Sequence, residues 1–288
     1  MREFKGKNAV ITGGASGIGL GIACRCVEEG MNVVLADINE ADLRRAVEAL
    51  KNRGVMVLGV RTDVSKRADV QALADRTLEK FGVVHLLVNN AGVGAGTSPW
   101  ESTWNDWEWV IGVDLWGVIN GVKIFTPIMV SQNTECHIVN TSSIAGMVAY
   151  MHSAPYQVVK HAVVALSENL SVALEMQKTL VKVSVLCPGF VRTRAMESDR
   201  NRPLELRDEP REMSLEQQAM LRAAREAVEA GMSPNELASH VFRAIREERF
   251  YILTHPEEMP SIQERMENIL RGRNPQNPSG TMTVPRGE

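Results

Sequence analysis

Short apolar runs alternate with amphipathic stretches over the first 190 residues of the chain. The apolar runs carry no polar alternation, so each is read as a strand buried on both faces. Apolar positions three or four apart predict helices between them. The expected strands are 8–12, 32–36, 56–61, 84–88, 137–141 and 181–186, and the expected helices are 17–29, 40–51, 68–81, 107 to about 130, and 156–178. This alternation predicts a doubly wound α/β fold, with a parallel sheet covered by helices on both faces.

The pattern changes after Pro188-Gly189. Residues 192–213 are charged and broken by Pro203 and Pro210, so we interpret them as a mobile loop or lid. Helices are expected at 215–230 and 235–247, the second capped by Ser233. A seventh strand at 250–254 and a helix at 260–270 follow. We predict one domain, 1–271, with a substrate loop region at 192–232 and a flexible tail at 272–288.

Composition narrows the class of protein. The 288 residues are 44% hydrophobic and carry a formal net charge of −3, which argues against a nucleic-acid partner. No run approaches the ~18 apolar residues of a membrane span, and the N-terminus lacks the apolar core of a signal peptide. The four cysteines, Cys24, Cys26, Cys136 and Cys187, form no C-x-x-C pair. We therefore expect a cytoplasmic protein with free thiols, no membrane contact and no metal site.

A glycine-rich turn, Thr-Gly-Gly-Ala-Ser-Gly-Ile-Gly, joins the first strand to the first helix at residues 12–19. Glycines allow a tight turn and a close diphosphate, and the free N–H groups at the helix start favour negative charge. The spacing of Gly13, Gly17 and Gly19 is G-x-x-x-G-x-G, which differs from the G-x-G-x-x-G fingerprint. Taken alone, such a turn is also compatible with an ordinary strand–helix connection.

Asp37 ends the second strand, eighteen residues after Gly19. A carboxylate there accepts hydrogen bonds from the adenosine ribose and repels a 2′-phosphate. The nearest following cation is Arg44, and Ser16 in the turn is not basic, so the pattern favours NAD over NADP. The alternative role for Asp37 is a helix cap, although Asn39 is placed to do that.

Tyr156 and Lys160 are one turn apart at the start of a predicted helix. A free tyrosine has a pKa near 10, and a neighbouring ammonium lowers the pKa of a phenol. Tyrosine then serves as a general base for an alcohol, or as the acid for a ketone. Ser143 follows the fifth strand, at the sheet edge where ligands of such folds bind. Its hydroxyl is placed to hold the substrate oxygen, with Ser142 as the alternative.

Together these motifs resemble the short-chain dehydrogenase/reductase family, across roughly residues 5–195. The matching pieces are 12–19, Asp63-Val64, Asn89-Asn90-Ala91-Gly92, Ser143, Tyr156-x-x-x-Lys160, and Pro188-Gly189 with Thr193. The resemblance implies a Rossmann-type domain with seven strands that binds NAD. The implied cofactor contacts are Gly13, Ser16, Gly17, Ile18, Gly19, Asp37, Asp63, Val64, Asn90, Ala91, Gly92, Tyr156, Lys160, Pro188, Gly189, Val191 and Thr193. It also implies a homodimer or homotetramer, formed through the two long central helices.

One position departs from the family's pattern. The family usually has Asn in the long helix where this chain has Asp114, and that Asn helps to hold a water in a proton relay to the catalytic lysine. Asp is tolerable if the main-chain carbonyl is the working group. Alternatively, its carboxylate pairs with Lys160 and changes its properties. We therefore include Asp114 with Ser143, Tyr156 and Lys160 in the catalytic set.

The expected function is NAD-linked interconversion of a secondary alcohol and a ketone, with alcohol oxidation as the favoured direction. The substrate is expected to be partly apolar. The candidate pocket residues are Val93, Gly94, Ala145, Val148, Met151 and His152. Two alternatives stay open: an NADPH-dependent carbonyl reductase, and a dinucleotide-binding sensor or scaffold without chemistry. Asp37 speaks against the first, and the intact Ser143, Tyr156 and Lys160 set against the second.

Overall fold

Seven parallel strands form one sheet at the centre of the computed structural model, which describes residues 1–51, 53–149, 153–209 and 213–275. The order across the sheet is β3-β2-β1-β4-β5-β6-β7. The strands are β1 (Asn8–Thr12), β2 (Asn32–Asp37), β3 (Val57–Arg61), β4 (Leu86–Asn89), β5 (Cys136–Thr141), β6 (Val181–Cys187) and β7 (Tyr251–Leu253). The doubly wound parallel sheet is therefore confirmed, and the expected strand bounds are correct to within two residues.

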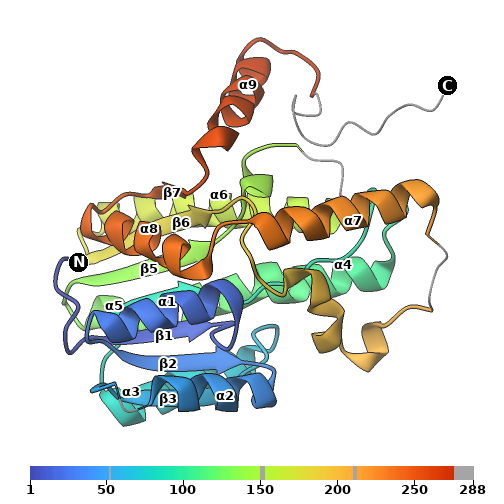
Figure 1. Ribbon diagram of the computed structural model, residues 1–288. Coiled ribbons are helices and arrows are strands. Elements are labelled where there is room, and N and C mark those ends of the chain that lie inside the picture. Colours follow the sequence, from blue (N-terminus) through green and yellow to red (C-terminus); the bar gives the residue numbers. More distant parts are fainter. Residues whose placement is uncertain (52, 150–152, 210–212, 276–288) are drawn as a thin grey trace.

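Helices cover both faces of the sheet (Figure 1). They are α1 (Gly17–Glu28), α2 (Glu40–Leu50), α3 (Arg67–Phe81), α4 (Trp104–Val110), α5 (Gly117–Ser131), α6 (Ala154–Met176), α7 (Leu215–Ala230), α8 (Pro234–Arg246) and α9 (Met259–Leu270). The Ser233 hydroxyl accepts the Glu236 N–H at 3.2 Å and caps α8, as expected. Helix α9 stands away from the sheet in Figure 1, and none of its residues is buried.

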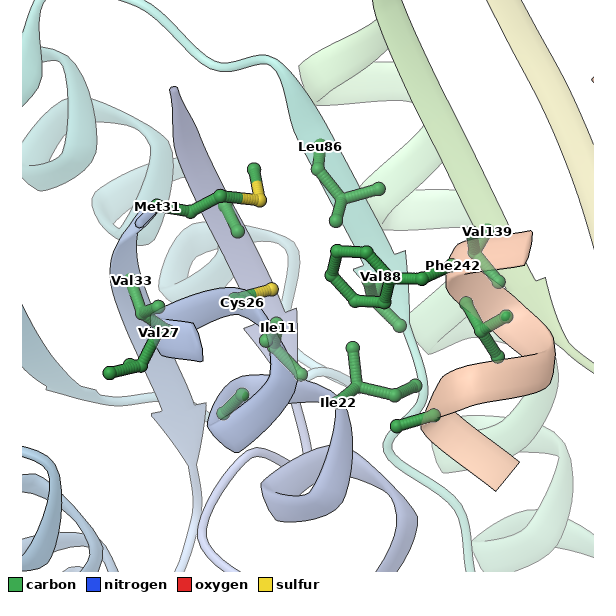
Figure 2. Packing of buried hydrophobic residues seen from close by; sticks show 14 of the residues in the cluster. Ile11, Ile22, Cys26, Val27, Met31, Val33, Leu86, Val88, Val139 and Phe242 are labelled. Atoms are coloured by element: carbon green, nitrogen blue, oxygen red, sulfur yellow. The ribbon is translucent and has the colours of Figure 1, made fainter. Parts of the chain in front are cut away.

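One apolar layer lies between the sheet and α1, α2 and α8. Figure 2 shows its centre, where Ile22 and Cys26 of α1 and Phe242 of α8 meet Ile11 and Val88 of the sheet. The opposite layer packs α3, α5 and α6 against the other side of the same strands, with Phe125 and Met129 fully buried. Because both faces are covered, the strands are mostly apolar, and polar strand residues such as His137, Asn140 and Ser184 are buried.

The helix expected at 107–130 begins earlier and is not uniform. A capping box of Thr103 and Asp106 starts α4 at Trp104. A π-helical segment, η1 (Ile111–Trp116), then separates α4 from α5. By length and composition the stretch Trp104–Ser131 could cross a membrane, but in this fold it packs against the sheet as a core helix, with Phe125 and Met129 fully buried. A π turn inside a helix often marks a functional site, and this one contains Asp114.

The segment after β6 is more ordered than its sequence indicated. We call residues 192–209 the crossover segment. It contains two short 3₁₀ helices, η3 (Ala195–Asn201) and η4 (Leu204–Leu206). Arg202 anchors it: its guanidinium lies 2.9 Å from Asp106 and stacks 4.9 Å from the Trp109 ring centroid. The described part of the expected mobile loop is thus held against α4; residues 210–212 lie outside the description, as do tail residues 276–288.

Candidate active site

The glycine-rich turn and the end of β4 are fastened to each other. The Thr12 hydroxyl accepts the N–H groups of Asn90 and Ala91 at 2.9 and 3.1 Å. The Asn90 amide in turn donates to the Thr12 carbonyl at 3.0 Å. Gly13 has a φ of +61°, and a Cβ there would lie 2.8 Å from the Ala91 Cα. Only glycine fits this approach, so the turn is held rigidly at the point where the strand order reverses.

The start of α1 is open to an anion. Ser16 occupies the N-cap but makes no side-chain capping hydrogen bond, so the cap leaves the first-turn N–H groups for another acceptor. A hollow of about 550 Å³ adjoins this end, lined by Gly17, Thr193, Arg194 and Ser233 among others. A Cβ on Gly17 would come within 3.1 Å of Thr193. Thr193 thus packs directly against Gly17, and the diphosphate contacts expected from the turn, Ile18 and Gly19 stay a prediction.

Asp37 ends β2 beside this turn. One of its carboxylate oxygens accepts the Ala15 N–H at 3.1 Å and the other accepts the Asn39 N–H at 3.0 Å. Burial raises the pKa of Asp37, against the lowering effect of these two amides. Asn39 caps α2 by accepting the Asp42 N–H. Since Asn39 is the cap, Asp37 is left with free lone pairs for ribose hydroxyls.

Asp63 and Val64 have structural partners of their own. The Asp63 carboxylate accepts both the N–H and the hydroxyl of Ser65, at 3.0 and 2.7 Å. The Val64 carbonyl accepts from the Asn120 amide at 2.9 Å. The first two contacts are local to the turn after β3, and the third joins this turn to α5. The adenine contacts that we expected from the two residues stay a prediction.

Tyr156 and Lys160 lie on one face of α6. The helix begins with Ser153, whose hydroxyl accepts the Tyr156 N–H at 3.4 Å and donates to the Ala95 carbonyl at 2.5 Å. This fixes the first turn against the loop after β4. The Lys160 ammonium lies 5.1 Å from the centroid of the Tyr156 ring. Tyr156 is partly exposed, whereas Lys160 is buried.

The two serines after β5 point to different partners. The Ser142 hydroxyl donates to the Lys160 carbonyl at 2.8 Å and so holds α6 to the sheet. The Ser143 hydroxyl accepts the Ala145 N–H at 3.2 Å and lies 3.4 Å from the Pro188 carbonyl. Ser142 is therefore committed to a backbone contact, and Ser143 is the better candidate to bind a substrate oxygen.

Asp114 forms a buried ion pair with Lys160, with its Oδ2 2.9 Å from Nζ. Its other oxygen, Oδ1, accepts the Val93 N–H at 2.7 Å. A Cβ on Gly92 would lie 3.1 Å from Asp114 Oδ2, so Gly92 makes room for the pair. Of the two possibilities considered for Asp114 from the sequence, the structure has the pairing with Lys160.

The turn after β6 closes the site and has a partner that sequence reasoning missed. His255, just after β7, accepts the Gly189 N–H on its Nδ1 at 3.0 Å. Ile144, next to Ser143, donates its N–H to the Pro188 carbonyl at 2.9 Å. Val191 pairs with Met232 in an isolated bridge. Gly189 and His255 are 66 positions apart in the sequence, so no local pattern reveals this contact.

Proteins of similar sequence and structure identify the family of this chain. The family model described as short chain dehydrogenase matches residues 7–203. The chain belongs to the short-chain dehydrogenase/reductase family. A short-chain dehydrogenase/reductase from Burkholderia phymatum, solved in complex with NAD, is 47% identical, with a TM-score of 0.94 over 99% of this chain and 100% of its own.

Curated relatives of this short-chain dehydrogenase/reductase match along nearly its whole length. A CLA biosynthesis dehydrogenase/reductase of Lactiplantibacillus plantarum is 35% identical over 94% of this chain and 95% of its own. A C alpha-dehydrogenase of Sphingobium sp. (strain NBRC 103272 / SYK-6) is 31% identical over 94% of this chain and 87% of its own. The chain is thus an oxidoreductase of this family, and its glycine-rich turn fits the family's nicotinamide dinucleotide.

The candidate pocket residues of this short-chain dehydrogenase/reductase differ in their surroundings. Gly94 donates its N–H to the Ser198 hydroxyl at 3.4 Å, so the crossover segment reaches the pocket side of the sheet edge. Ala145 is 9% exposed, but Val148 is fully buried, and we withdraw Val148 as a pocket residue because solvent does not reach it. Met151 and His152 lie outside the described residues.

Two further expectations concern metals and thiols. All four cysteines are free, although Cys24 is only partly buried. Within the described ranges, no group of three or more His, Cys, Asp or Glu side chains is placed to hold a metal ion. The residues that the structure brings together at this edge are instead hydroxyls, one phenol and one ammonium, which suit proton transfer.

Proposed function

We propose that this enzyme interconverts a secondary alcohol and a ketone with NAD as its cofactor. The observation that carries the proposal is the placement of the Tyr156 ring 5.1 Å from a buried ammonium, at the sheet edge that also holds the open glycine-rich turn. An ammonium beside a phenol favours the phenolate form, which is the base that alcohol oxidation requires.

The roles divide among the residues at this edge. When bound, the nicotinamide supplies the acceptor or donor of hydride. Ser143 holds the substrate oxygen, and Tyr156 takes the hydroxyl proton in oxidation or returns it in reduction. Lys160 steadies the phenolate charge and binds the nicotinamide ribose. Pro188, Gly189, Val191 and Thr193 hold the carboxamide end, and Asn90, Ala91 and Gly92 lie under the middle of the cofactor.

Asp37 is the reason to propose NAD rather than NADP. Its carboxylate sits at the end of β2 and keeps lone pairs for both ribose hydroxyls, and its charge repels a 2′-phosphate. The NAD complex of the Burkholderia phymatum relative is in keeping with this choice.

The substrate is proposed to be partly apolar, and the enzyme a cytoplasmic homodimer or homotetramer. Gly94 and Ala145 add no polar side chain at the pocket. The relatives include a C alpha-dehydrogenase and a 1-deoxy-11-beta-hydroxypentalenate dehydrogenase, names that indicate dehydrogenation. Oxidation is the proposed direction.

The first test is a fluorescence titration with NADH and NADPH separately. We expect NADH to bind at least tenfold more tightly, about 1.4 kcal/mol. A panel of bulky secondary alcohols with NAD then tests turnover, which should disappear in Tyr156→Phe while NADH binding persists. Preferred binding of NADPH would instead indicate a carbonyl reductase. Binding without turnover of any alcohol or ketone would indicate a sensor or scaffold.

A further inference from the structure

Proton transfer by Tyr156 and Lys160 does not by itself require the buried ion pair between Asp114 and Lys160. The Asp114 side chain is 0% exposed and the Lys160 side chain is 5% exposed. Both carboxylate oxygens face a donor, because Oδ2 meets the ammonium and Oδ1 meets the Val93 N–H. Two donors at one carboxyl group are what an ionised carboxylate requires. The geometry therefore indicates a charged pair.

Burial and mutual attraction act in opposite directions on the pKa values of both groups of the pair. Burial by itself lowers the pKa of Lys160, but the Asp114 carboxylate and Tyr156 outweigh it, and the pKa of the lysine is raised. Burial raises the pKa of Asp114, against the lowering effect of Lys160 and of the Val93 N–H. The ammonium and the Val93 N–H thus favour the charged form of Asp114 against its burial, and the carboxylate favours the charged form of Lys160.

Other ionisable groups near Lys160 do not change the balance. Cys187 of β6 faces it, but burial raises the pKa of this thiol to about 12, so it is neutral. Of the acids on α4, Asp106 pairs with Arg202 and Glu108 is exposed. Within the described ranges, Asp114 and Tyr156 are thus the ionisable groups whose charge interacts with that of Lys160.

The ammonium is also held in direction. The ammonium forms the ion pair with Asp114 Oδ2 at 2.9 Å and donates to the Thr141 carbonyl at 3.4 Å, while the Tyr156 ring centroid lies 5.1 Å away. A carboxylate on one side of the ammonium reduces the positive potential on the other side, where the phenol is.

We propose that Asp114 is a positioning residue that partly neutralises Lys160, and so sets the pH at which Tyr156 gives up its proton. An amide at this position, as the family usually has, carries no charge, so it would not offset the positive potential of the ammonium at the phenol. With the carboxylate present, Tyr156 holds its proton to higher pH. For turnover the inference rests on the proposed function: oxidation should rise toward alkaline pH, and ketone reduction should extend to higher pH.

The test follows tyrosinate absorbance in the full-length protein and needs no substrate. The difference between the wild type and Tyr156→Phe isolates the titration of this one tyrosine. The same difference is taken between Asp114→Asn and Asp114→Asn/Tyr156→Phe. We expect the Asp114→Asn midpoint to be lower by about one pH unit, a tenfold change in proton dissociation. An unchanged or higher midpoint would overturn the proposal.

Glu108→Gln is the matched control. It removes one negative charge from an exposed position six residues earlier in the same helical stretch, and its midpoint should equal that of the wild type. An equal shift in this control would mean that net charge, not the pair, is responsible. If Asp114→Asn does not fold, the infrared carboxyl band of the wild-type protein decides: a protonated Asp114 at neutral pH contradicts the proposal.

Failure of this inference and failure of the proposed function are distinguishable. NADH titration of the wild type tests the function without reference to Asp114. If NADH binds and the midpoint does not move, only the role of Asp114 is lost. If the midpoint moves and no nucleotide binds, the ion pair stands and the proposed function is lost.

Discussion

Asp37 shows how much a single residue decides in this site. Both of its oxygens are held by backbone N–H groups, from Ala15 and Asn39, so the carboxylate is fixed before any ligand arrives. Fixed groups bind without the entropic cost of ordering a side chain. The preference for NAD that we propose therefore depends on a carboxylate held in one orientation.

Replacing Asp37 with Asn is expected to reduce the preference for NADH over NADPH about tenfold or more, which is about 1.4 kcal/mol. The substitution keeps the shape of the side chain but removes the charge that repels a 2′-phosphate. Fluorescence titration with both nucleotides measures the ratio of dissociation constants. Asp75→Asn, on the exposed side of α3, is the control and should leave the ratio as it is in the wild type.

The sequence was sufficient for residues whose roles depend on their neighbours in the chain. The caps at Asn39 and Ser233 and the glycine turn are local, and each lies where the pattern placed it. The choice of Ser143 over Ser142 also follows from strand alternation. The Asp114–Lys160 contact needed two elements brought together, so the sequence offered the pairing only as one of two possibilities, and the structure shows it.

At the scale of elements, α5 lies close to β4 because of one glycine. A Cβ on Gly121 would fall 2.0 Å from Oδ1 of Asn89, a side chain fully enclosed between α5 and the sheet. The Asn89 amide donates to Asn140 at 2.8 Å, and Asn140 donates to Ser167 at 3.0 Å. This buried polar chain joins β4, β5 and α6 beneath the site, so it has little freedom to move aside.

Gly121→Ala is therefore expected to destabilise the protein by about 1–3 kcal/mol or more, measured by urea unfolding. Gly112→Ala is the matched control in the same helical stretch. A Cβ there meets nothing nearer than the Ser65 Cβ at 3.7 Å, so alanine should be neutral or stabilise by up to about 1 kcal/mol. Equal effects of the two substitutions would contradict the argument from close approach.

The crossover segment is the element that sequence reasoning described least well. Charged residues and prolines are typical of a mobile loop, yet Arg202 is 10% exposed and contacts Asp106 and the Trp109 ring. Asp208 adds further contacts, since it accepts from Thr103 and Asn105 at 2.6 and 2.8 Å. These partners lie about a hundred residues away in the sequence, which no local pattern can reveal.

Arg202→Ala should loosen the crossover segment. The partly buried Asp106 loses its counter-charge. We therefore expect faster cleavage by chymotrypsin at Leu204 and Leu206 and a KM for the alcohol raised at least tenfold, about 1.4 kcal/mol. Chymotrypsin is chosen because loss of an arginine does not alter its sites. Arg207→Ala, at an exposed position in the same segment, is the control. Wild-type cleavage and KM in Arg202→Ala would show that Arg202 is not an anchor.

At the scale of the whole molecule, the strand order explains where the site lies. The order reverses between β1 and β4, and the ends of these strands, with β2, β5 and β6, carry the residues of the site. The alternation of strands and helices predicted this edge of the sheet as the location of the site, but not the strand order. What the sequence did not predict is that the crossover segment touches this edge at several separate points.

Those contacts couple the crossover segment to both ends of the proposed cofactor site. Arg194 lies 3.5 Å from Asp42 of α2, and the Asn39 amide lies 3.4 Å from Asn201, both beside the ribose end at Asp37. Ser198 accepts from Gly94 on the pocket side. The crossover segment therefore lies against the proposed cofactor site at its ribose end and against the proposed pocket at Gly94.

We accordingly expect NADH to slow chymotryptic cleavage of the crossover segment, and Arg194→Ala to release NADH a few-fold faster in a stopped-flow experiment. Asp42→Asn should have the same effect, because it removes the other half of the ion pair. The double variant should release NADH no faster than either single variant, since residues of one pair are not additive. Additive effects would mean that Arg194 and Asp42 act separately, Arg194 through Glu197 and Asp42 through Arg45, and that their mutual contact contributes nothing to retention.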